Sequence, residues 1–251
     1  MFFKKRKSNG KETDGIIITE NASGAKIEGY NRLRDNILFL NADGNNKVIQ
    51  VESSVAHEGK TTVATNLAVS LGLTDKKVVV VDLDFHRPNV HRFLGTSLET
   101  GLAEYVLGQA EIKDVIKKTE YKNVDIISRG AKIYNSSVVF ISDKFKTLIK
   151  KLREDYDYVI LDCAPILQVS DYINISQVSD GVLFLVAYGM TTRNQVSDAI
   201  KELNKNNTKI LGTVFTMYDR KKSIYGENAY YGKGYYSYYR STLDDDAKKD
   251  K

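Results

Sequence analysis

The sequence predicts an α/β fold in which a doubly wound, mostly parallel sheet carries helices on both faces. Short runs of β-branched and other apolar residues alternate with longer amphipathic stretches, which is the rhythm of βαβ units. Some of these runs are continuously apolar, as strands covered on both faces are. Acidic residues come directly after two of the apolar runs. In parallel sheets, ligands bind at these carboxyl ends of the strands.

The expected elements alternate along the chain. The first strand covers residues 48–51, and the helix after it covers residues 59–71. Residues 78–81 are all valine, so we expect a central strand, covered on both faces. The other expected strands cover residues 124–127, 158–161, 182–186 and 210–215, and the later helices cover residues 142–155 and 192–206. Right-handed crossovers between these strands give a doubly wound sheet.

The chain divides into three regions that differ in composition. Residues 1–24 are polar and basic and contain Gly and Ser, which predicts a flexible segment. Residues 25–220 carry the strand and helix pattern and form the predicted domain. In residues 221–251, tyrosines are interleaved with Gly, Ser, Lys and Asn, without a helical or strand period. We expect this tyrosine-rich C-terminal tail to be disordered.

Composition excludes several classes of protein. The 251 residues have a formal net charge of +5, with acidic residues between the basic ones, so nucleic acid is not an expected partner. The single cysteine, Cys163, excludes an internal disulfide framework and fits a reducing compartment. No apolar run approaches the roughly 20 residues of a membrane helix, and the start lacks the apolar stretch of a signal peptide. We therefore expect a cytoplasmic protein.

A phosphate-binding loop is predicted between the first strand and the first helix, at residues 54–61. Gly59, Lys60 and Thr61 form its diagnostic end. Backbone N–H groups at the helix start cradle phosphate, the lysine reaches the β- and γ-oxygens, and the threonine hydroxyl binds Mg²⁺. The alternative is an ordinary strand-to-helix turn. We expect a P-loop NTPase with ATP and Mg²⁺ as ligands, and the expected nucleotide-binding residues here are Ala56, His57, Glu58, Gly59, Lys60, Thr61 and Thr62.

Three aspartates at strand ends complete the predicted site. Asp82 and Asp84 follow the valine run, and in an extended strand their spacing would put both carboxylates on one face. A solvated, Asp-rich loop is the alternative. Asp162 ends the run 158–161 in the form of a Walker B element, whose carboxylate holds Mg²⁺ directly or through a water. Three motifs in this order, each at a strand end, are far more specific than any one of them.

Together these motifs resemble the bacterial tyrosine kinases of capsule and exopolysaccharide assembly, which are relatives of the partition-type P-loop ATPases. The resemblance extends from Glu28 to the tyrosine-rich tail and includes residues 33–37, 87–91, 170–171 and 180–182. It implies Lys60, Asp82, Asp84 and Arg87 as catalytic residues and Thr61, Asp84 and Asp162 as metal ligands. Asp82 is the implied base that takes the proton from the incoming tyrosine hydroxyl, whose pKa is near 10.

The same resemblance implies autophosphorylation of the tail. The implied phosphoacceptors are Tyr225, Tyr230, Tyr231, Tyr235, Tyr236, Tyr238 and Tyr239. One subunit's tail would enter its neighbour's site in a ring, assembled through a Glu-x-x-Arg-x-x-Arg element. Here this element is represented by Glu28, Arg32 and Arg34, with Asn31 at the position of the first arginine.

The resemblance also implies the cellular context of the chain. The implied partners are a membrane adaptor that activates the kinase, further copies of this chain and a tyrosine phosphatase. Through the adaptor, the chain would lie at the inner face of the cell membrane. Its implied role is to regulate the synthesis and export of capsule or exopolysaccharide.

Several positions differ from the family pattern. Ala56 and His57 stand in a loop that is usually rich in Pro and Gly, so the backbone has less freedom where it curls around phosphate. His86 stands where an arginine is usual. Thr216 replaces an asparagine at the end of the last strand, where we expect it to contact the nucleotide base. The usual Pro-Asn-Pro segment corresponds to residues 134–136.

Two other functions are compatible with the phosphate loop. A partition-type switch ATPase would carry a second lysine five residues before the loop lysine, where this chain has Val55. A nucleotide-binding scaffold without catalytic activity is the other alternative. For the tail, the alternative is a low-complexity segment that binds a partner by stacking. Because its aromatic residues are almost all tyrosines, each with a hydroxyl, phosphoacceptors are favoured.

Overall fold

The computed structural model describes residues 15–18 and 24–218, and the fold below is that of the unit that ends at Thr216. Its helices are α1 (Ala25–Leu40), α2 (Lys60–Gly72), α3 (Val90–Phe93), α4 (Leu102–Val106), α5 (Ile112–Val115), α6 (Ser137–Ile141), α7 (Asp143–Asp155), α8 (Tyr172–Ser176) and α9 (Arg193–Lys205). Its strands are β1 (Val48–Ser53), β2 (Val78–Asp82), β3 (Ile116–Lys118), β4 (Val124–Ile127), β5 (Tyr158–Asp162), β6 (Gly181–Ala187) and β7 (Ile210–Thr216).

Among the described residues, seven strands form one sheet in the order β3-β4-β2-β5-β1-β6-β7. β1 pairs in parallel with β5 and β6, β2 with β4 and β5, and β7 with β6, whereas β3 pairs antiparallel with β4. The carboxyl ends of β1, β2 and β5 therefore lie side by side at one end of the sheet. This arrangement confirms the predicted α/β fold with a mostly parallel sheet.

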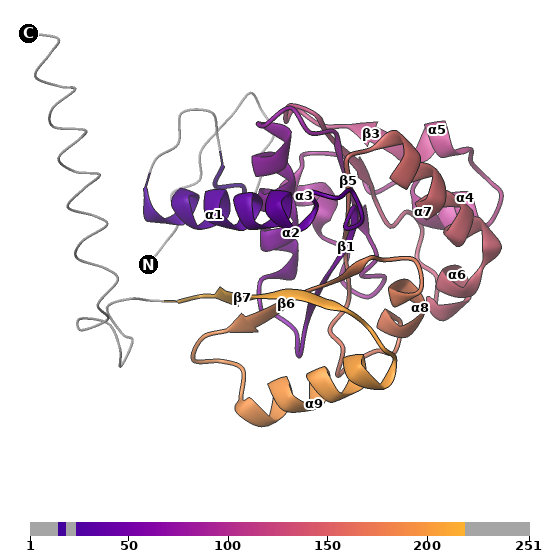
Figure 1. Ribbon diagram of the computed structural model, residues 1–251. Helices are drawn as coiled ribbons and strands as arrows, with labels where there is room; N and C mark the ends of the chain where they lie inside the picture. Colours follow the sequence, from indigo (N-terminus) through magenta and orange to yellow (C-terminus); the bar gives the residue numbers. More distant parts are fainter. Residues whose placement is uncertain (1–14, 19–23, 219–251) are drawn as a thin grey trace, which may run out of the picture. The chain divides into compact units, whose positions relative to one another are not determined.

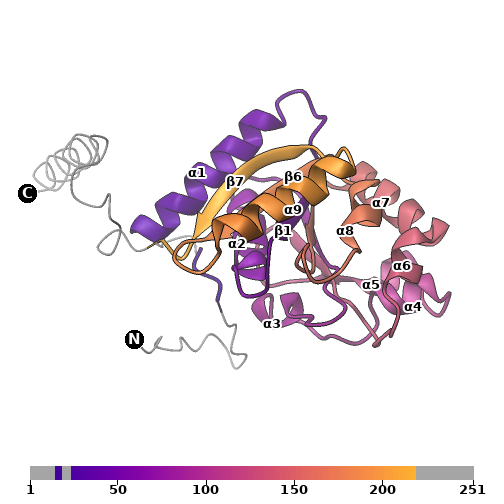
Figure 2. The same ribbon diagram turned by 90° about the horizontal axis from the view of Figure 1, so that it is seen from below.

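Helices cover both faces of the sheet, as predicted. On one face, Ile37 of α1 and Leu67 of α2 belong to the same buried cluster as Leu183 of β6. On the other face, Leu203 of α9 packs in a cluster with Phe184, the next residue of β6. Figures 1 and 2 show α1 and α9 on opposite sides of β6 and β7. No helix in the described part of the chain is long and apolar enough to cross a membrane.

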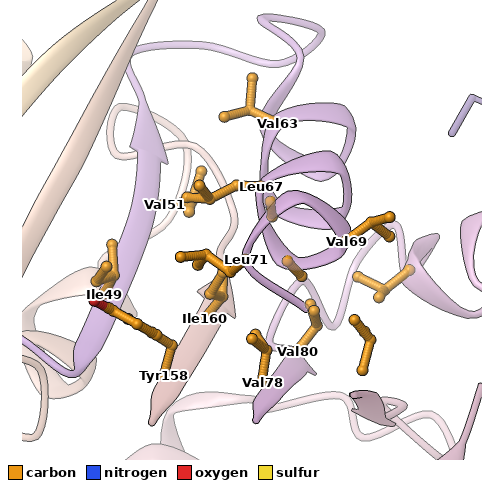
Figure 3. Close-up of a cluster of buried hydrophobic side chains, with 14 of the residues drawn as sticks. Ile49, Val51, Val63, Leu67, Val69, Leu71, Val78, Val80, Tyr158 and Ile160 are labelled. Carbon is orange, nitrogen blue, oxygen red and sulfur yellow. The ribbon is translucent and has the colours of Figure 1, made fainter. Parts of the chain in front are cut away.

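The helix α2 is packed tightly on the centre of the sheet (Figure 3). Leu67 and Leu71 have no exposed surface, and they share a buried cluster with Val51 of β1, Val80 of β2 and Ile160 of β5. Burial of each such side chain contributes about 1.5–3 kcal/mol. Because these contacts fix α2 against three strands, they also fix the position of its first residues, which form the end of the predicted phosphate loop.

Residues 15–18, within the segment predicted to be flexible, pack against α2. The side-chain Oδ1 of Asn66 accepts hydrogen bonds from the N–H groups of Ile17 (2.7 Å) and Ile18 (3.3 Å). Its Nδ2 donates to the carbonyl oxygen of Gly15 (3.0 Å). Ile18 is 2% exposed and belongs to the buried cluster under α2. We call residues 15–18 the N-terminal strap; the domain boundaries at residues 24 and 220 stay predictions.

Candidate functional site

The loop between β1 and α2 turns sharply before the helix begins. Gly59 has a φ of +91°, in the left-handed region that glycine adopts readily. His57 is also left-handed, with a φ of +67°, although it carries a side chain, and this conformation costs roughly 1–2 kcal/mol. The helix begins at Lys60, so its free N–H groups are available to an anion at the loop.

Lys60 is nearly buried at the first position of α2, with 7% of its surface exposed. Its ammonium Nζ donates a hydrogen bond to the hydroxyl of Ser53, the last residue of β1, over 3.0 Å. The positive charge of Lys60 also favours the ionised forms of Glu52 and Asp162. The lysine is therefore held inside a group of acidic and hydroxyl side chains, where it can act on a phosphate oxygen.

The predicted metal ligands Thr61 and Asp162 are in direct contact. The Thr61 hydroxyl donates to Asp162 Oδ2 over 2.7 Å, joining the start of α2 to the end of β5. The other oxygen, Asp162 Oδ1, is buried and has no hydrogen-bond partner. Burial raises the pKa of Asp162 to about 7, although the hydrogen bond from Thr61 and the charge of Lys60 lower it. A cation at this point would satisfy the unpaired oxygen.

Asp82 lies beside Asp162, because the two residues are register partners on β2 and β5. Asp82 Oδ2 accepts hydrogen bonds from the backbone N–H groups of Asn89 (3.0 Å) and Val90 (3.1 Å), at the start of α3. Asp82 Oδ1 is buried without a partner. Burial raises the pKa of Asp82 well above its usual range, and the charge of Asp162 raises it further. Two such carboxyls side by side favour proton or cation uptake.

Asp84 and Arg87 lie in the loop after β2. The strand ends at Asp82, so the extended spacing assumed for the two aspartates does not continue to Asp84. Instead, Asp84 Oδ1 accepts from the backbone N–H groups of His86 (3.1 Å) and Arg87 (2.8 Å). The Arg87 guanidinium Nη1 lies 3.1 Å from His57 Nε2. The loop after β2 is thereby linked to the phosphate loop.

The donor set of this site fits a magnesium ion. Mg²⁺ prefers oxygen ligands and is usually held by one or two carboxylates together with substrate phosphates. Thr61 supplies a hydroxyl, and Asp162 has an unpartnered buried oxygen. Within residues 15–18 and 24–218, no cluster of three or more His, Cys, Asp or Glu side chains could hold a metal by itself. The hydroxyl of Thr61 and the carboxylate of Asp162 are oxygen donors of the kind that Mg²⁺ prefers.

Other predicted nucleotide-binding residues surround the loop. Ala56, in the loop, and Thr61 and Thr62, in the first turn of α2, are partly exposed, whereas the side chain of Glu58 is fully buried. Thr216, at the end of β7, lies against the loop: its hydroxyl donates to the carbonyl oxygen of Glu58 over 2.7 Å. The structure thus brings Thr216 to the phosphate loop, as the prediction of a shared nucleotide site requires.

Sequence reasoning missed Glu52 and Ser53, two polar residues at the end of β1. Ser53 accepts from Lys60, and Glu52 is fully buried with its Oε2 unpartnered. Gln50 Nε2 donates to Glu52 Oε1 over 2.7 Å. The sequence does hold one signal for these two residues, because they are polar and end a strand that is otherwise predicted to be buried. Buried polar groups need hydrogen-bond partners.

The predicted oligomerisation residues lie on α1. Glu28 and Arg32, one helical turn apart, form an ion pair of 3.0 Å on an exposed face. The guanidinium of Arg34 contacts Asp35 (2.9 Å) and Asn31 (3.1 Å). The predicted phosphoacceptor tyrosines at 225–239 lie outside the described residues.

Fold and site together define a P-loop nucleotide-binding domain, and comparisons with known proteins agree. The AAA domain family model matches residues 46–213. The tyrosine-protein kinase YwqD of Bacillus subtilis (strain 168) is 30% identical over 232 residues, which are 92% of this chain and 97% of YwqD. The tyrosine-protein kinase ptk of Acinetobacter johnsonii is 30% identical over 84% of this chain. The chain belongs to the AAA domain family and to the bacterial tyrosine-protein kinases.

Solved structures share the fold of this chain. The kinase domain of the Escherichia coli tyrosine kinase ETK aligns with a TM-score of 0.76 and 26% identity, over 85% of each chain. The septum site-determining protein MinD of Pyrococcus horikoshii OT3, solved with Mg-ADP, aligns with a TM-score of 0.61 and 27% identity, over 70% of this chain and 72% of that one. The predicted enzyme class is confirmed at the level of the family.

The chain differs in extent from some of these relatives. It spans nearly all of YwqD but 29% of the length of ptk and 31% of the tyrosine-protein kinase wzc of Salmonella typhimurium. It therefore corresponds to one part of the longer relatives.

Proposed function

We propose that this chain is an ATP-dependent protein-tyrosine kinase that phosphorylates the tyrosines of its own C-terminal tail. The observation that carries the proposal is the convergence of Lys60, Thr61, Asp82 and Asp162 at adjoining ends of α2, β2 and β5. Membership of the bacterial tyrosine-protein kinases supports it.

The proposed roles follow from the contacts. Lys60 and the N–H groups at the start of α2 bind the β- and γ-phosphates of ATP. Thr61, Asp84 and Asp162 would hold Mg²⁺, which would neutralise charge on these phosphates. Arg87, in the loop after β2, contributes a further positive charge beside the phosphates.

Asp82 is the proposed base of the reaction. The tyrosine oxygen forms a bond to the γ-phosphorus, the bond from that phosphorus to the bridging oxygen of ADP breaks, and the phenolic proton passes to Asp82. Burial and the neighbouring Asp162 raise the pKa of Asp82, which favours this proton uptake.

The proposed acceptors are the tail tyrosines, phosphorylated in trans by a neighbouring subunit. The ion pair of Glu28 with Arg32 on α1, together with Arg34, marks the proposed assembly surface. The proposed partners are a membrane adaptor, further copies of the chain and a tyrosine phosphatase. Through the adaptor the kinase would act at the cell membrane in the synthesis and export of capsule or exopolysaccharide.

A switch ATPase without a protein substrate is the second candidate, and the structural match to MinD favours it. Such a protein would release phosphate without modifying tyrosine. Val55 at the position of the second lysine counts against this candidate.

One experiment separates these functions. The purified chain is incubated with ATP and Mg²⁺, with and without the cytoplasmic peptide of the adaptor, and phosphotyrosine is mapped by mass spectrometry. We expect phosphotyrosine between residues 225 and 239, and none in Lys60→Met or Asp82→Asn. Phosphate release without phosphotyrosine would select the switch ATPase. Neither product, with the peptide present, would select the non-catalytic scaffold.

A further inference from the structure

Glu58 is an acidic residue inside a loop that is proposed to hold a triphosphate. A carboxylate that faced the phosphates would repel them, because both groups are negatively charged. The side chain of Glu58 is instead fully buried, with 0% of its surface exposed. A buried carboxylate needs hydrogen-bond donors, and the donors that it finds belong to two different segments of the chain.

Both oxygens of the Glu58 carboxylate are used. Oε2 accepts from the backbone N–H of Val55, within the phosphate loop itself, over 2.9 Å. Oε1 accepts from the backbone N–H of Ala187, the last residue of β6, over 3.2 Å, and from the hydroxyl of Thr191. One side chain therefore ties the phosphate loop to the segment that joins β6 to α9.

A second set of bonds strengthens this link. The Thr216 hydroxyl donates to the carbonyl oxygen of Glu58 over 2.7 Å, and the backbone N–H of Tyr188 donates to the carbonyl oxygen of Thr216 over 3.0 Å. The end of β7 is thus joined to the same two segments. We call residues 187–191 and Thr216 the base-side wall, because Thr216 stands where the nucleotide base is expected.

We propose that Glu58 is a positioning residue that sets the base-side wall relative to the phosphate loop. The proposal rests on the nucleotide site described under the proposed function. The two oxygens of the Glu58 carboxylate have different roles. The bond to Val55 shapes the loop that binds phosphate, whereas the bonds to Ala187 and Thr191 place the wall. Binding of a ligand with both a base and phosphates depends on both sets of hydrogen bonds. Binding of a ligand made of phosphate alone depends only on the bond to Val55.

The test compares binding of Mg-ADP and Mg-pyrophosphate to the full chain by calorimetry. Thr191→Val removes a hydroxyl donor from the wall and leaves the bond to Val55 intact. We expect it to weaken Mg-ADP binding by about tenfold, the scale for a lost hydrogen bond to a charged group, and to leave pyrophosphate binding unchanged. Thr213→Val, on the exposed face of β7, is the matched control and should change neither.

Glu58→Ala removes the hydrogen bond to Val55 and those to Ala187 and Thr191, so we expect weaker binding of both Mg-ADP and Mg-pyrophosphate. The double variant Glu58→Ala/Thr191→Val should bind Mg-ADP no more weakly than Glu58→Ala alone, because the two groups share one interaction. Equal losses for both ligands in Thr191→Val, no loss at all, or additive losses in the double variant would overturn the proposal. A wild-type chain that binds neither ligand would instead refute the nucleotide site itself. Thermal melting without ligand confirms that each variant is folded.

Discussion

At the scale of single residues, Glu52 is a fully buried carboxyl with an unpartnered oxygen. It lies on the interior strand β1, close enough to Lys60 and Cys163 for both to lower its pKa. Burial raises the pKa of Glu52 to about 8, even though the hydrogen bond from Gln50 and the charge of Lys60 lower it. The folded chain therefore keeps a proton on Glu52 at pH values where the unfolded chain has lost it.

This proton makes stability depend on pH. A carboxyl whose pKa is raised by folding stabilises the folded state fully below its unfolded pKa, near 4.3. That contribution is lost as the pH rises toward about 8. We expect the free energy of unfolding of the nucleotide-free chain to fall by a few kcal/mol between pH 5 and pH 8. Urea denaturation across this range measures it. Glu52→Gln should make the curve less steep, and the raised pKa values of Asp82 and Asp162 account for the slope that remains. An equally steep curve in the variant would contradict this account.

The residues of the site differ in how far the sequence could predict them. Lys60, Thr61 and Asp162 were predictable because their roles follow from position at a strand or helix end, and the structure brings them together. The sequence could not predict Glu52 and Ser53 as site residues, because their importance comes from being buried close to Lys60. Burial beside another residue depends on pairing between distant segments, which local patterns do not encode.

At the scale of elements, α2 is held at both ends. Its first turn belongs to the site, and its last residue, Gly72, lies against the segment before β4. A Cβ atom added to Gly72 would lie 2.2 Å from the carbonyl oxygen of Lys122 and 2.9 Å from a methyl of Val124. The helix can approach β4 this closely only because the residue is glycine.

We therefore expect Gly72→Ala to lower the free energy of unfolding by about 2 kcal/mol or more, since backbone atoms would have to shift. Gly212→Ala on β7 is the matched control, because nothing lies within 4 Å of the added Cβ. Chemical denaturation of both variants measures the difference. Equal stability of the two would show that the end of α2 moves more easily than these contacts indicate.

Most elements could be predicted from their patterns. All six expected strands are present, and the helices expected at 59–71, 142–155 and 192–206 are α2, α7 and α9. The antiparallel strand β3 has three residues, which is too short to show a period of two. α1 was not predicted as a helix, and its exposed Phe39 and Leu40 blur the apolar stripe that would reveal it.

At the scale of the whole molecule, the N-terminal strap ties the beginning of the chain to the helix of the phosphate loop. Ile18 buries its side chain, and Asn66 holds the strap backbone. We expect removal of residues 1–18 to lower the free energy of unfolding by about 2 kcal/mol or more, from the lost burial of Ile18. A chain that starts at Gly15 keeps these contacts and is the control. Similar unfolding curves for the two truncations would contradict this expectation.

Assembly gives a second prediction at this scale, which rests on the proposed function. Each phosphate adds a charge of about −1.5 to −2, so several phosphotyrosines would reverse the local charge of the tail. We expect phosphorylated chains to sediment as smaller species than dephosphorylated chains at equal concentration. An unchanged sedimentation profile would refute the idea that tails in neighbouring sites hold the assembly together.

Cys163 gives this protein an internal reporter. It is the sole cysteine of the chain, it is 1% exposed, and it directly follows Asp162. Burial raises the pKa of its thiol well above the usual range, so it is inert to alkylating reagents until the centre of the sheet opens. The rate at which a thiol reagent modifies Cys163 therefore reports how often the centre of the sheet opens. A nucleotide that binds at the site should lower this rate in the wild-type protein.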